Sequence, residues 1–206
     1  MYSLDTNEAR KADSTGSVIR ELGKYVGAIT QAEDVKASTG TRGIALTFKS
    51  DAGQTTRVTL YTMKPDGEKI MGYQMLMAIM TCMELREIKP VAGTVKFWDN
   101  DARKEDTKNA TVFPTLCKPL GVLLETEDYV KNDGGLGTRM VLKGVFQAKT
   151  ELTASEILDR KTQPEQLSKL VALLRHRPVR AAKGAPQARA ASTGNGFDSM
   201  DDDIPF

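Results

Sequence analysis

The stretch GKYVGAITQAEDVKASTGTRGIALTFKSDAGQTTRVTLYTM (residues 23–63) decides the fold class, because apolar and polar residues alternate in it. Two segments rich in turn-forming residues, KASTGTRG and SDAGQ, divide it into three runs. In the third run, Val58 and Leu60 alternate with polar neighbours. A period of two is typical of antiparallel strands that bury one face. We therefore expect three strands, at roughly 24–32, 42–50 and 55–63.

One helix and more strands are expected downstream. From Ile70 to Met83, apolar residues recur at steps of three and four, which predicts an amphipathic helix over about 68–85. The charged segment 99–109 is expected to be an exposed loop, and NDGGLG at 132–137 a hairpin turn. Strand-like patterns return at 93–99, 110–118, 120–131 and 138–149.

Two short helical stretches follow, over 153–160 and 163–176. The first begins with a capping box, in which Thr153 is the N-cap and Glu156 stands three residues later. The second carries Leu167 and Leu170 on one side. Beyond His176 the sequence is rich in Ala, Gly, Pro and Ser, which is typical of disordered segments.

This order of elements predicts a mainly β fold. Short antiparallel strands around a mid-chain helix suit a small closed barrel of the oligonucleotide/oligosaccharide-binding (OB) type. A different β-barrel or a β-sandwich with one helix is the alternative. The expected division is a flexible N-terminal arm, an OB domain, a helical appendix, and a disordered linker with an acidic tip, at 1–17, 18–150, 151–176 and 177–206.

Composition narrows the class of protein. Hydrophobic residues make up 40% of the chain, which suffices for a core, and no apolar run approaches the roughly 18 residues that span a membrane. The polar N-terminus lacks the apolar region of a secretory signal, so we expect a cytoplasmic protein without a membrane partner. Cys82 and Cys117 have apolar neighbours, which predicts buried free thiols.

The motifs of common enzymes are missing from the sequence. His176, the one histidine, stands between two arginines, and neither G-x-S-x-G nor a Walker phosphate loop occurs. The acids of 99–106 are interleaved with Lys and Arg, as in a solvated loop. We expect no catalytic residues, no cofactor and no metal site. A metal-dependent nuclease that uses this acidic loop is the least favoured alternative.

A binding surface for single-stranded nucleic acid is better supported. Such surfaces combine cations that follow the phosphates with aromatic rings that stack on bases. Alternation places Lys96 and Trp98 on one face of their strand and Arg57 and Tyr61 on one face of theirs. The alternative is that Trp98 covers the edge of the core. The candidate DNA-binding residues are Lys24, Tyr25, Lys49, Arg57, Tyr61, Lys96, Trp98, Arg139 and Lys143.

The end of the chain predicts a second binding function. Residues 176–190 carry four cations and no acid, whereas residues 191–206 carry four aspartates and no cation. The last seven residues are MDDDIPF. Their acids can meet cations on another protein, or fold back onto this protein's own basic surface, while their apolar side chains enter a small pocket. The candidate partner-binding residues are Asp201, Asp202, Asp203, Ile204, Pro205 and Phe206.

Two resemblances give these patterns a biological setting. The ending DDDIPF resembles the tip of bacterial single-stranded-DNA-binding proteins, which recruits replication, recombination and repair enzymes. Residues 20–150 resemble a group of phage-encoded early proteins through GKYVGAI, TGTRGIALTFKSDAG and YVKNDGG. Members of that group are assigned as OB-fold proteins that bind single-stranded DNA. The resemblance implies a phage protein, active in the bacterial host cell, that recruits host enzymes.

Two readings of this function stay open. In the first, the body binds and protects single-stranded DNA while the tip recruits enzymes of replication, recombination or repair. In the second, the protein is an adaptor or decoy that occupies the tail-binding pockets of host enzymes and does not coat DNA. The sequence also leaves open whether the chain forms a homo-oligomer, how many nucleotides it covers, and whether it prefers DNA or RNA.

Overall fold

The structure is a computed structural model of the 206-residue chain, and it describes residues 18–99, 102–131 and 133–179. Its elements in chain order are β1 (Gly23–Lys36), β2 (Arg42–Ser50), β3 (Thr55–Met63), α2 (Met71–Cys82), β4 (Val91–Asp99), β5 (Lys104–Val112), the 3-10 turn η1 (Pro114–Leu116), β6 (Pro119–Val130), β7 (Leu136–Phe146), α3 (Ala154–Leu158) and α4 (Leu167–Ala172).

The described part of the chain is mainly β, with a seven-stranded antiparallel sheet and few helices. β1 is the central strand, because it pairs with β2 along one edge and with β6 and β5 along the other. β7 pairs with β6, and β4 pairs with β5. β3 and β7 contact each other, but no ladder among the described residues joins them, so hydrogen bonding does not close the sheet.

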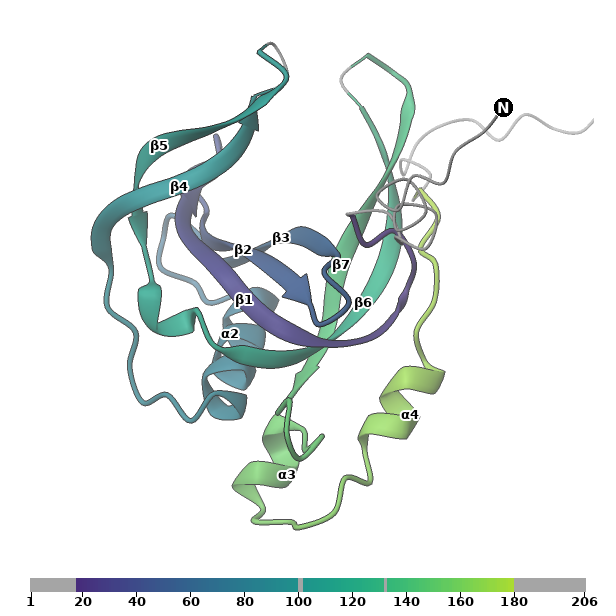
Figure 1. Cartoon of the computed structure of the whole chain (residues 1–206). Helices are drawn as coiled ribbons and strands as arrows, with labels where there is room; N and C mark the ends of the chain where they lie inside the picture. The colour runs from purple at the N-terminus through teal and green to yellow at the C-terminus, as the bar shows by residue number, and fades with distance from the viewer. Residues whose placement is uncertain (1–17, 100–101, 132, 180–206) are drawn as a thin grey trace, which may run out of the picture.

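Two hairpins rise from the sheet as arms. Figure 1 shows the β4–β5 hairpin and the β6–β7 hairpin extending in the same direction from opposite sides, with β1, β2 and β3 between them and α2 beneath. β1 bends between these neighbours, and its pairing with β2 shifts register between Ile29 and Gln31. Gly27 is required here, since a Cβ atom on it would lie 2.1 Å from the carbonyl oxygen of Lys49.

The core lies between the sheet and α2. Alternation puts Val58 and Leu60 of β3 into this core, together with Ile44, Leu46 and Phe48 of β2. α2 contributes Leu76, Ile79 and Met80, which confirms that most of its apolar stripe packs inward. Gly72 lets the helix approach closely, since a Cβ there would lie 2.1 Å from the carbonyl oxygen of Tyr61.

Two expectations about the middle of the chain were wrong. Residues 104–109 belong to strand β5, whereas we expected an exposed loop, and the strand expected at 110–118 ends at Val112. A 3-10 turn follows, starting at Pro114. β5 shows no hydrophobic alternation in its sequence because none of its residues is buried. Its backbone ladder with β4 and its ion pairs hold it in place instead.

The prediction for the cysteines was half right. Both are free thiols, and Cys82 on α2 is buried as expected. Burial raises the pKa of the Cys82 thiol to about 12. Cys117 is exposed, because the 3-10 turn before it places Leu116 in the core and leaves the next residue outside.

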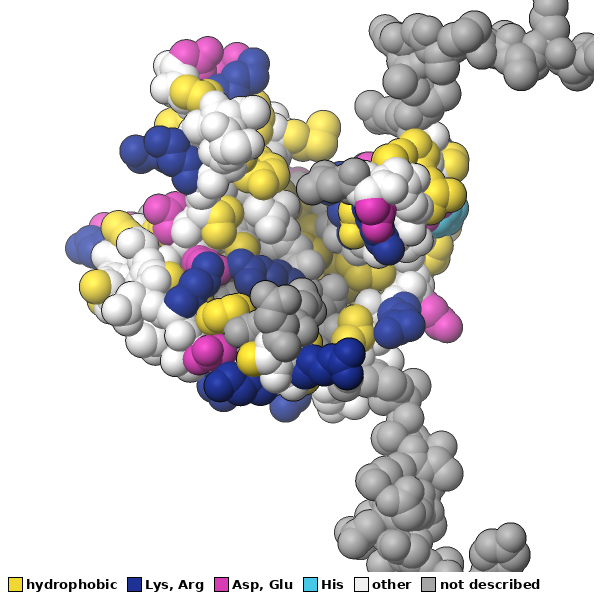
Figure 2. All heavy atoms as spheres, turned by 90° about the horizontal axis from the view of Figure 1, so that it is seen from above, with side chains coloured by type: hydrophobic (Ala, Val, Ile, Leu, Met, Phe, Trp, Pro, Cys, Tyr) yellow, Lys and Arg dark blue, Asp and Glu magenta, His cyan; other side chains and the backbone are white. Residues whose placement is uncertain are grey.

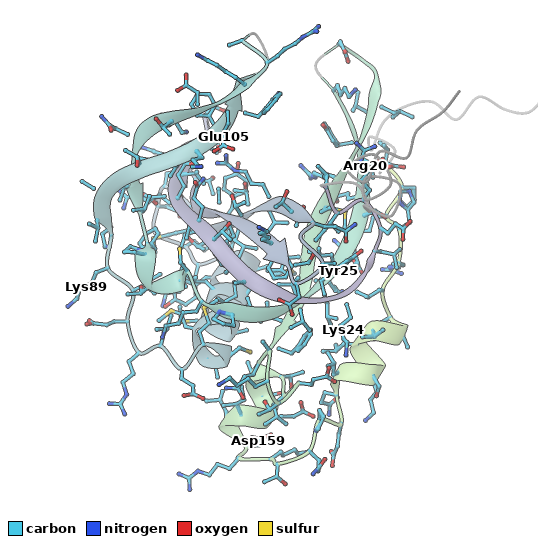
Figure 3. All side chains as sticks on the ribbon, in the orientation of Figure 1. Arg20, Lys24, Tyr25, Lys89, Glu105 and Asp159 are labelled. Atoms are coloured by element: carbon cyan, nitrogen blue, oxygen red, sulfur yellow. The ribbon has the colours of Figure 1, made fainter. Side chains whose placement is uncertain are left out.

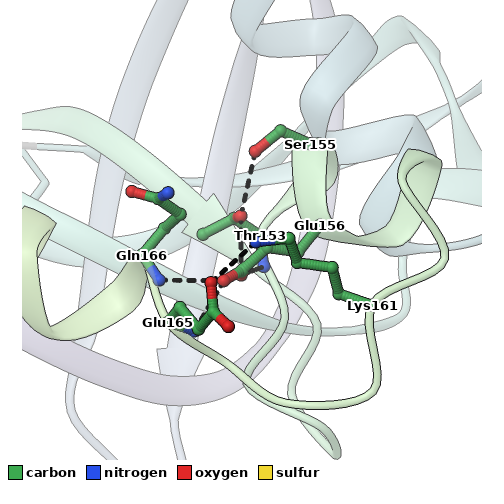
Figure 4. A network of polar contacts seen from close by, with 6 residues as sticks. All are labelled: Thr153, Ser155, Glu156, Lys161, Glu165 and Gln166. Carbon is green, nitrogen blue, oxygen red and sulfur yellow. Dashed lines mark hydrogen bonds and ion pairs between the residues drawn. The ribbon is translucent and has the colours of Figure 1, made fainter.

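The helical appendix packs on the strands through a small second core, in which Leu167 of α4 meets Leu123 and Phe146. The predicted capping box of α3 is present, and its acid does more than cap. Glu156 is buried and accepts hydrogen bonds from the backbone N–H and the hydroxyl of Thr153. Its other oxygen accepts the N–H groups of Glu165 and Gln166, at 2.6 and 2.8 Å (Figure 4).

These hydrogen bonds decide the charge state of Glu156. Burial alone would raise the pKa of this carboxyl, but the backbone N–H groups of Thr153, Gln166 and Glu165 and the Thr153 hydroxyl lower it from 4.5 to about 2. The carboxylate therefore ties the start of α3 to the residues just before α4.

The last described residues return to the sheet. Arg177 forms a parallel bridge with Glu127 of β6, and its backbone N–H donates to the carbonyl oxygen of Thr126 at 2.7 Å. Its guanidinium pairs with Glu125, which is fully buried. Residues 177–179 thus belong to the described body, although we expected the disordered linker to begin at 177. No helix among the described residues is long and apolar enough to cross a membrane.

Candidate nucleic-acid interface

An open groove of about 630 Å³ lies where the β4–β5 hairpin meets the sheet. Four of the predicted DNA-binding residues line it together: Lys49, Arg57, Lys96 and Trp98. Phe97 and several threonine side chains of β1, β2 and β3 line the groove as well. Viewed from above, the molecule shows Lys and Arg side chains across this face, with apolar side chains between them (Figure 2). The groove thus combines rings, cations and hydroxyls.

Trp98 is the more exposed of the two aromatic residues that line this groove. Alternation along β4 buries Val95 and turns Lys96 and Trp98 outward, as expected. Trp98, the only tryptophan of the chain, is 62% exposed. Exposing the face of so large a ring to water is unfavourable, and a stacked group would cover it. Nucleic-acid bases stack on such rings.

Two contacts of Lys96 fix the hairpin that carries Trp98. The side-chain amide of Gln31 on β1 accepts a hydrogen bond from the Lys96 N–H at 2.9 Å and donates to the Lys96 carbonyl oxygen at 3.2 Å. The Lys96 ammonium pairs at 2.7 Å with Glu105 of β5, which lies opposite Trp98 in the hairpin. The hydrogen bond to Glu105 and the attraction of its carboxylate raise the pKa of Lys96.

A buried carboxylate holds the second cation of the groove. Glu33 on β1 is almost fully buried and pairs with Arg57 of β3 and Lys108 of β5, both at 2.6 Å. Both cations are about half exposed. The carboxylate therefore pairs with two cations and joins strands β1, β3 and β5. Each cation is half exposed and keeps N–H donors that the carboxylate does not use.

The structure places the other predicted DNA-binding residues elsewhere. Tyr61 is exposed on the same face of β3 as Arg57, four residues further and so about 13 Å along the strand. Arg139 and Lys143 lie on β7, beyond the groove, where Arg139 pairs with Glu127 at 2.6 Å and lies 5.6 Å from the Tyr129 ring.

Lys24 and Tyr25 lie away from these residues. Figure 3 places both on the side of β1 that faces α4, far from Glu105 in the β4–β5 hairpin. Lys24 pairs with Glu151, and the Tyr25 hydroxyl donates to the carbonyl oxygen of Glu21. Tyr25 is partly buried and packs on the core. The structure thus gives these two residues structural contacts and does not bring them to the groove.

Sequence reasoning missed the residues that support the groove. Gln31 and Glu33 alternate on the polar face of β1, which was the available signal, but the sequence does not show that β4 and β5 cross that face. It also missed Arg20, which lies just before β1 next to the groove. The predicted tip at residues 201–206 lies outside the described residues.

Cations, aromatic rings and threonine residues make up most of the groove's lining. Its one lining carboxylate, Glu105, is held by Lys96. Within the described ranges, no group of three or more His, Cys, Asp or Glu residues is placed to hold a metal ion. A search with the chain's sequence matches no protein-family model and no curated protein.

Proposed function

We propose that this protein binds and protects single-stranded DNA through the groove at the β4–β5 hairpin. The observation that carries the proposal is the exposed Trp98 beside Lys96, facing the cations Lys49 and Arg57 across one open groove. Stacking on the indole supplies roughly 1–3 kcal/mol per base, and the three cations supply a salt-dependent attraction for phosphates.

The strand arrangement supports an OB-type barrel as the scaffold. β1 pairs with β2 and with β6, while β7 lies against β3. The helix α2 follows β3 and plugs the core beneath these strands. A partly open five-stranded barrel is the OB plan. The β4–β5 hairpin is then an added arm that carries the stacking residue.

The proposed setting is phage DNA replication, recombination or repair. In this setting the acidic tip, Asp201 to Phe206, recruits the enzymes of these processes. The resemblance of its sequence to the tip of bacterial single-stranded-DNA-binding proteins supports this role. A body that holds DNA and a tip that holds enzymes bring the two together on unpaired strands.

The intrinsic fluorescence of Trp98 tests the DNA-binding half directly. Titration with oligo(dT) at low salt is expected to quench the emission, and added salt is expected to restore it. Binding of a labelled oligonucleotide to Trp98→Ala, followed by anisotropy, is expected to weaken about 5- to 150-fold, as the loss of one stacked base predicts. Leu158→Ala, which shortens a similarly exposed apolar side chain on α3, is the matched control.

A failure to bind oligo(dT) would contradict the proposed DNA-binding function. If the wild-type protein leaves oligo(dT) unbound at low salt, while its tip still binds a host enzyme, the adaptor or decoy reading replaces it. Thermal unfolding followed by circular dichroism shows whether Trp98→Ala is folded. We expect an unchanged melting temperature, because the exposed indole contributes little to the core.

A further inference from the structure

A second hollow adjoins the Trp98 groove and a third adjoins the second, and neighbouring hollows share lining residues. The second hollow, about 500 Å³, lies between β3 and β7, and it shares Val18, Thr56 and Arg57 with the groove. The third, about 620 Å³, lies along β6, β7 and residues 175–179, and it shares Arg139 with the second. Shared lining residues thus link the three hollows in series, from the β4–β5 arm, across the open seam between β3 and β7, to the C-terminal segment.

Cations predominate along this path. Eight Lys and Arg residues line the three hollows against three carboxylates, Glu105, Glu127 and Asp128. Each of those acids already has a partner: Lys96 holds Glu105, Arg139 holds Glu127, and His176 holds Asp128. The second hollow has cations and no acid among its lining residues.

The cations are of two kinds. Lys96, Arg57, Arg139 and Arg177 are each held by a carboxylate. Four others make no ion pair with any residue that the structure describes: Lys49, Arg20, Lys143 and Arg175. Each hollow holds at least one of these four. A cation without a carboxylate partner can neutralise a phosphate and so release the counterion condensed on that phosphate.

Ion pairs and hydrogen bonds hold the residues of the third hollow in place. Arg177 anchors its floor, through the buried Glu125 and two backbone hydrogen bonds to β6. The ring nitrogens of His176 lie 2.9 Å from the Thr126 hydroxyl and 2.9 Å from an Asp128 oxygen. These contacts fix the segment that carries Arg175, which lines this hollow together with Lys143 of β7.

We propose that single-stranded DNA continues from the Trp98 groove through the second hollow to a phosphate-binding site made by Lys143 and Arg175. This inference rests on the proposed function and adds a path and a second contact to it. It implies a short inner site, where Trp98 stacks, and a longer full site within the range of about 4–16 nucleotides that OB folds cover.

The experiment compares two oligonucleotide lengths. The short one is the shortest oligo(dT) that fully quenches Trp98, and the long one has about 15 nucleotides. The double variant Lys143→Gln/Arg175→Gln is expected to bind the long one roughly 10- to 30-fold more weakly at 0.1 M salt, with a salt slope lower by about 1.4. Its affinity for the short one is expected to be unchanged.

The control makes the same charge change away from the path. Arg86→Gln/Lys118→Gln alters two exposed cations that line none of the three hollows. Equal affinity of both double variants for the long oligonucleotide, or an equal loss for both lengths in Lys143→Gln/Arg175→Gln, would overturn the path. In either case the quenching of Trp98 by the short oligonucleotide still reports on the proposed function by itself.

Discussion

Glu33 is the residue that organises the groove, although it does not line it. Its carboxylate is buried and pairs with Arg57 and Lys108, so two cations from different strands converge on one acid. Alternation along the strands predicted that Arg57, Lys96 and Trp98 face outward, and the structure confirms this. The pairing itself was out of reach, because it depends on which strands lie beside β1.

Glu33→Gln is expected to lower the stability of the body and to make DNA binding depend more strongly on salt. Loss of the buried, charge-assisted hydrogen bonds is expected to lower the free energy of unfolding by about 1–3 kcal/mol. DNA binding is expected to depend more steeply on salt, by up to about 1.4 in slope, because Arg57 and Lys108 are released toward phosphates. Urea unfolding and oligo(dT) titrations at several salt concentrations measure the two effects.

Glu68→Gln is the control for that substitution, since Glu68 pairs with Lys64 at an exposed position. It is expected to change the unfolding free energy by less than about 1 kcal/mol. A shallower salt dependence in Glu33→Gln would contradict the expectation and would mean that the carboxylate is needed to aim the cations.

Among the elements, the helical appendix and the β4–β5 hairpin show where sequence patterns succeed and fail. The capping box of α3 was readable, because it depends on residues three apart in the sequence. The further bonds of Glu156 to residues 165–166 were not, because they depend on how the chain turns back. β5 was missed for a related reason. Its side chains stay in solvent, so its sequence lacks the alternating apolar residues that mark a strand with one buried face.

Glu156→Gln is expected to lower the stability in a pH-dependent way. The folded-state pKa of this carboxyl is lowered from 4.5 to about 2, so its stabilisation is complete above about pH 4.5 and is lost as the pH falls toward 2. At pH 7 the variant is expected to be about 1–3 kcal/mol less stable, since a buried acceptor is replaced in part by a donor. The difference is expected to shrink between pH 4.5 and 2.

Urea unfolding at pH 7 and pH 3 measures this effect. Glu165→Gln makes the same chemical change at an exposed residue that pairs with Lys161, and it is expected to show little difference at either pH. A gap between wild type and Glu156→Gln that is as large at pH 3 as at pH 7 would show that the charge of Glu156 does not matter.

For the whole molecule, the proposed division of labour can be tested at the end of the chain. Deleting residues 201–206 is expected to abolish binding to a purified host enzyme that recognises the tip of bacterial single-stranded-DNA-binding proteins. The affinity for oligo(dT) is expected to stay equal or to rise, because three aspartates are removed from a protein that binds an anion.

A chain with the order of residues 201–206 reversed keeps the composition and charge of the tip, and it serves as the control. It is expected to lose the enzyme as well, since the terminal phenylalanine and carboxylate no longer coincide. Retained enzyme binding in either protein would assign recruitment to another surface.

The position of Cys117 outside the core has a practical consequence for studying the whole molecule. Cys82 is buried, and its pKa of about 12 keeps it in the unreactive thiol form, whereas Cys117 lies at the surface after the 3-10 turn. A maleimide dye should therefore attach at one place on the natural chain. Burial also raises the pKa of Cys117, so mildly alkaline buffer favours the coupling. The labelled protein would let single molecules be watched on stretched DNA without any change to its sequence.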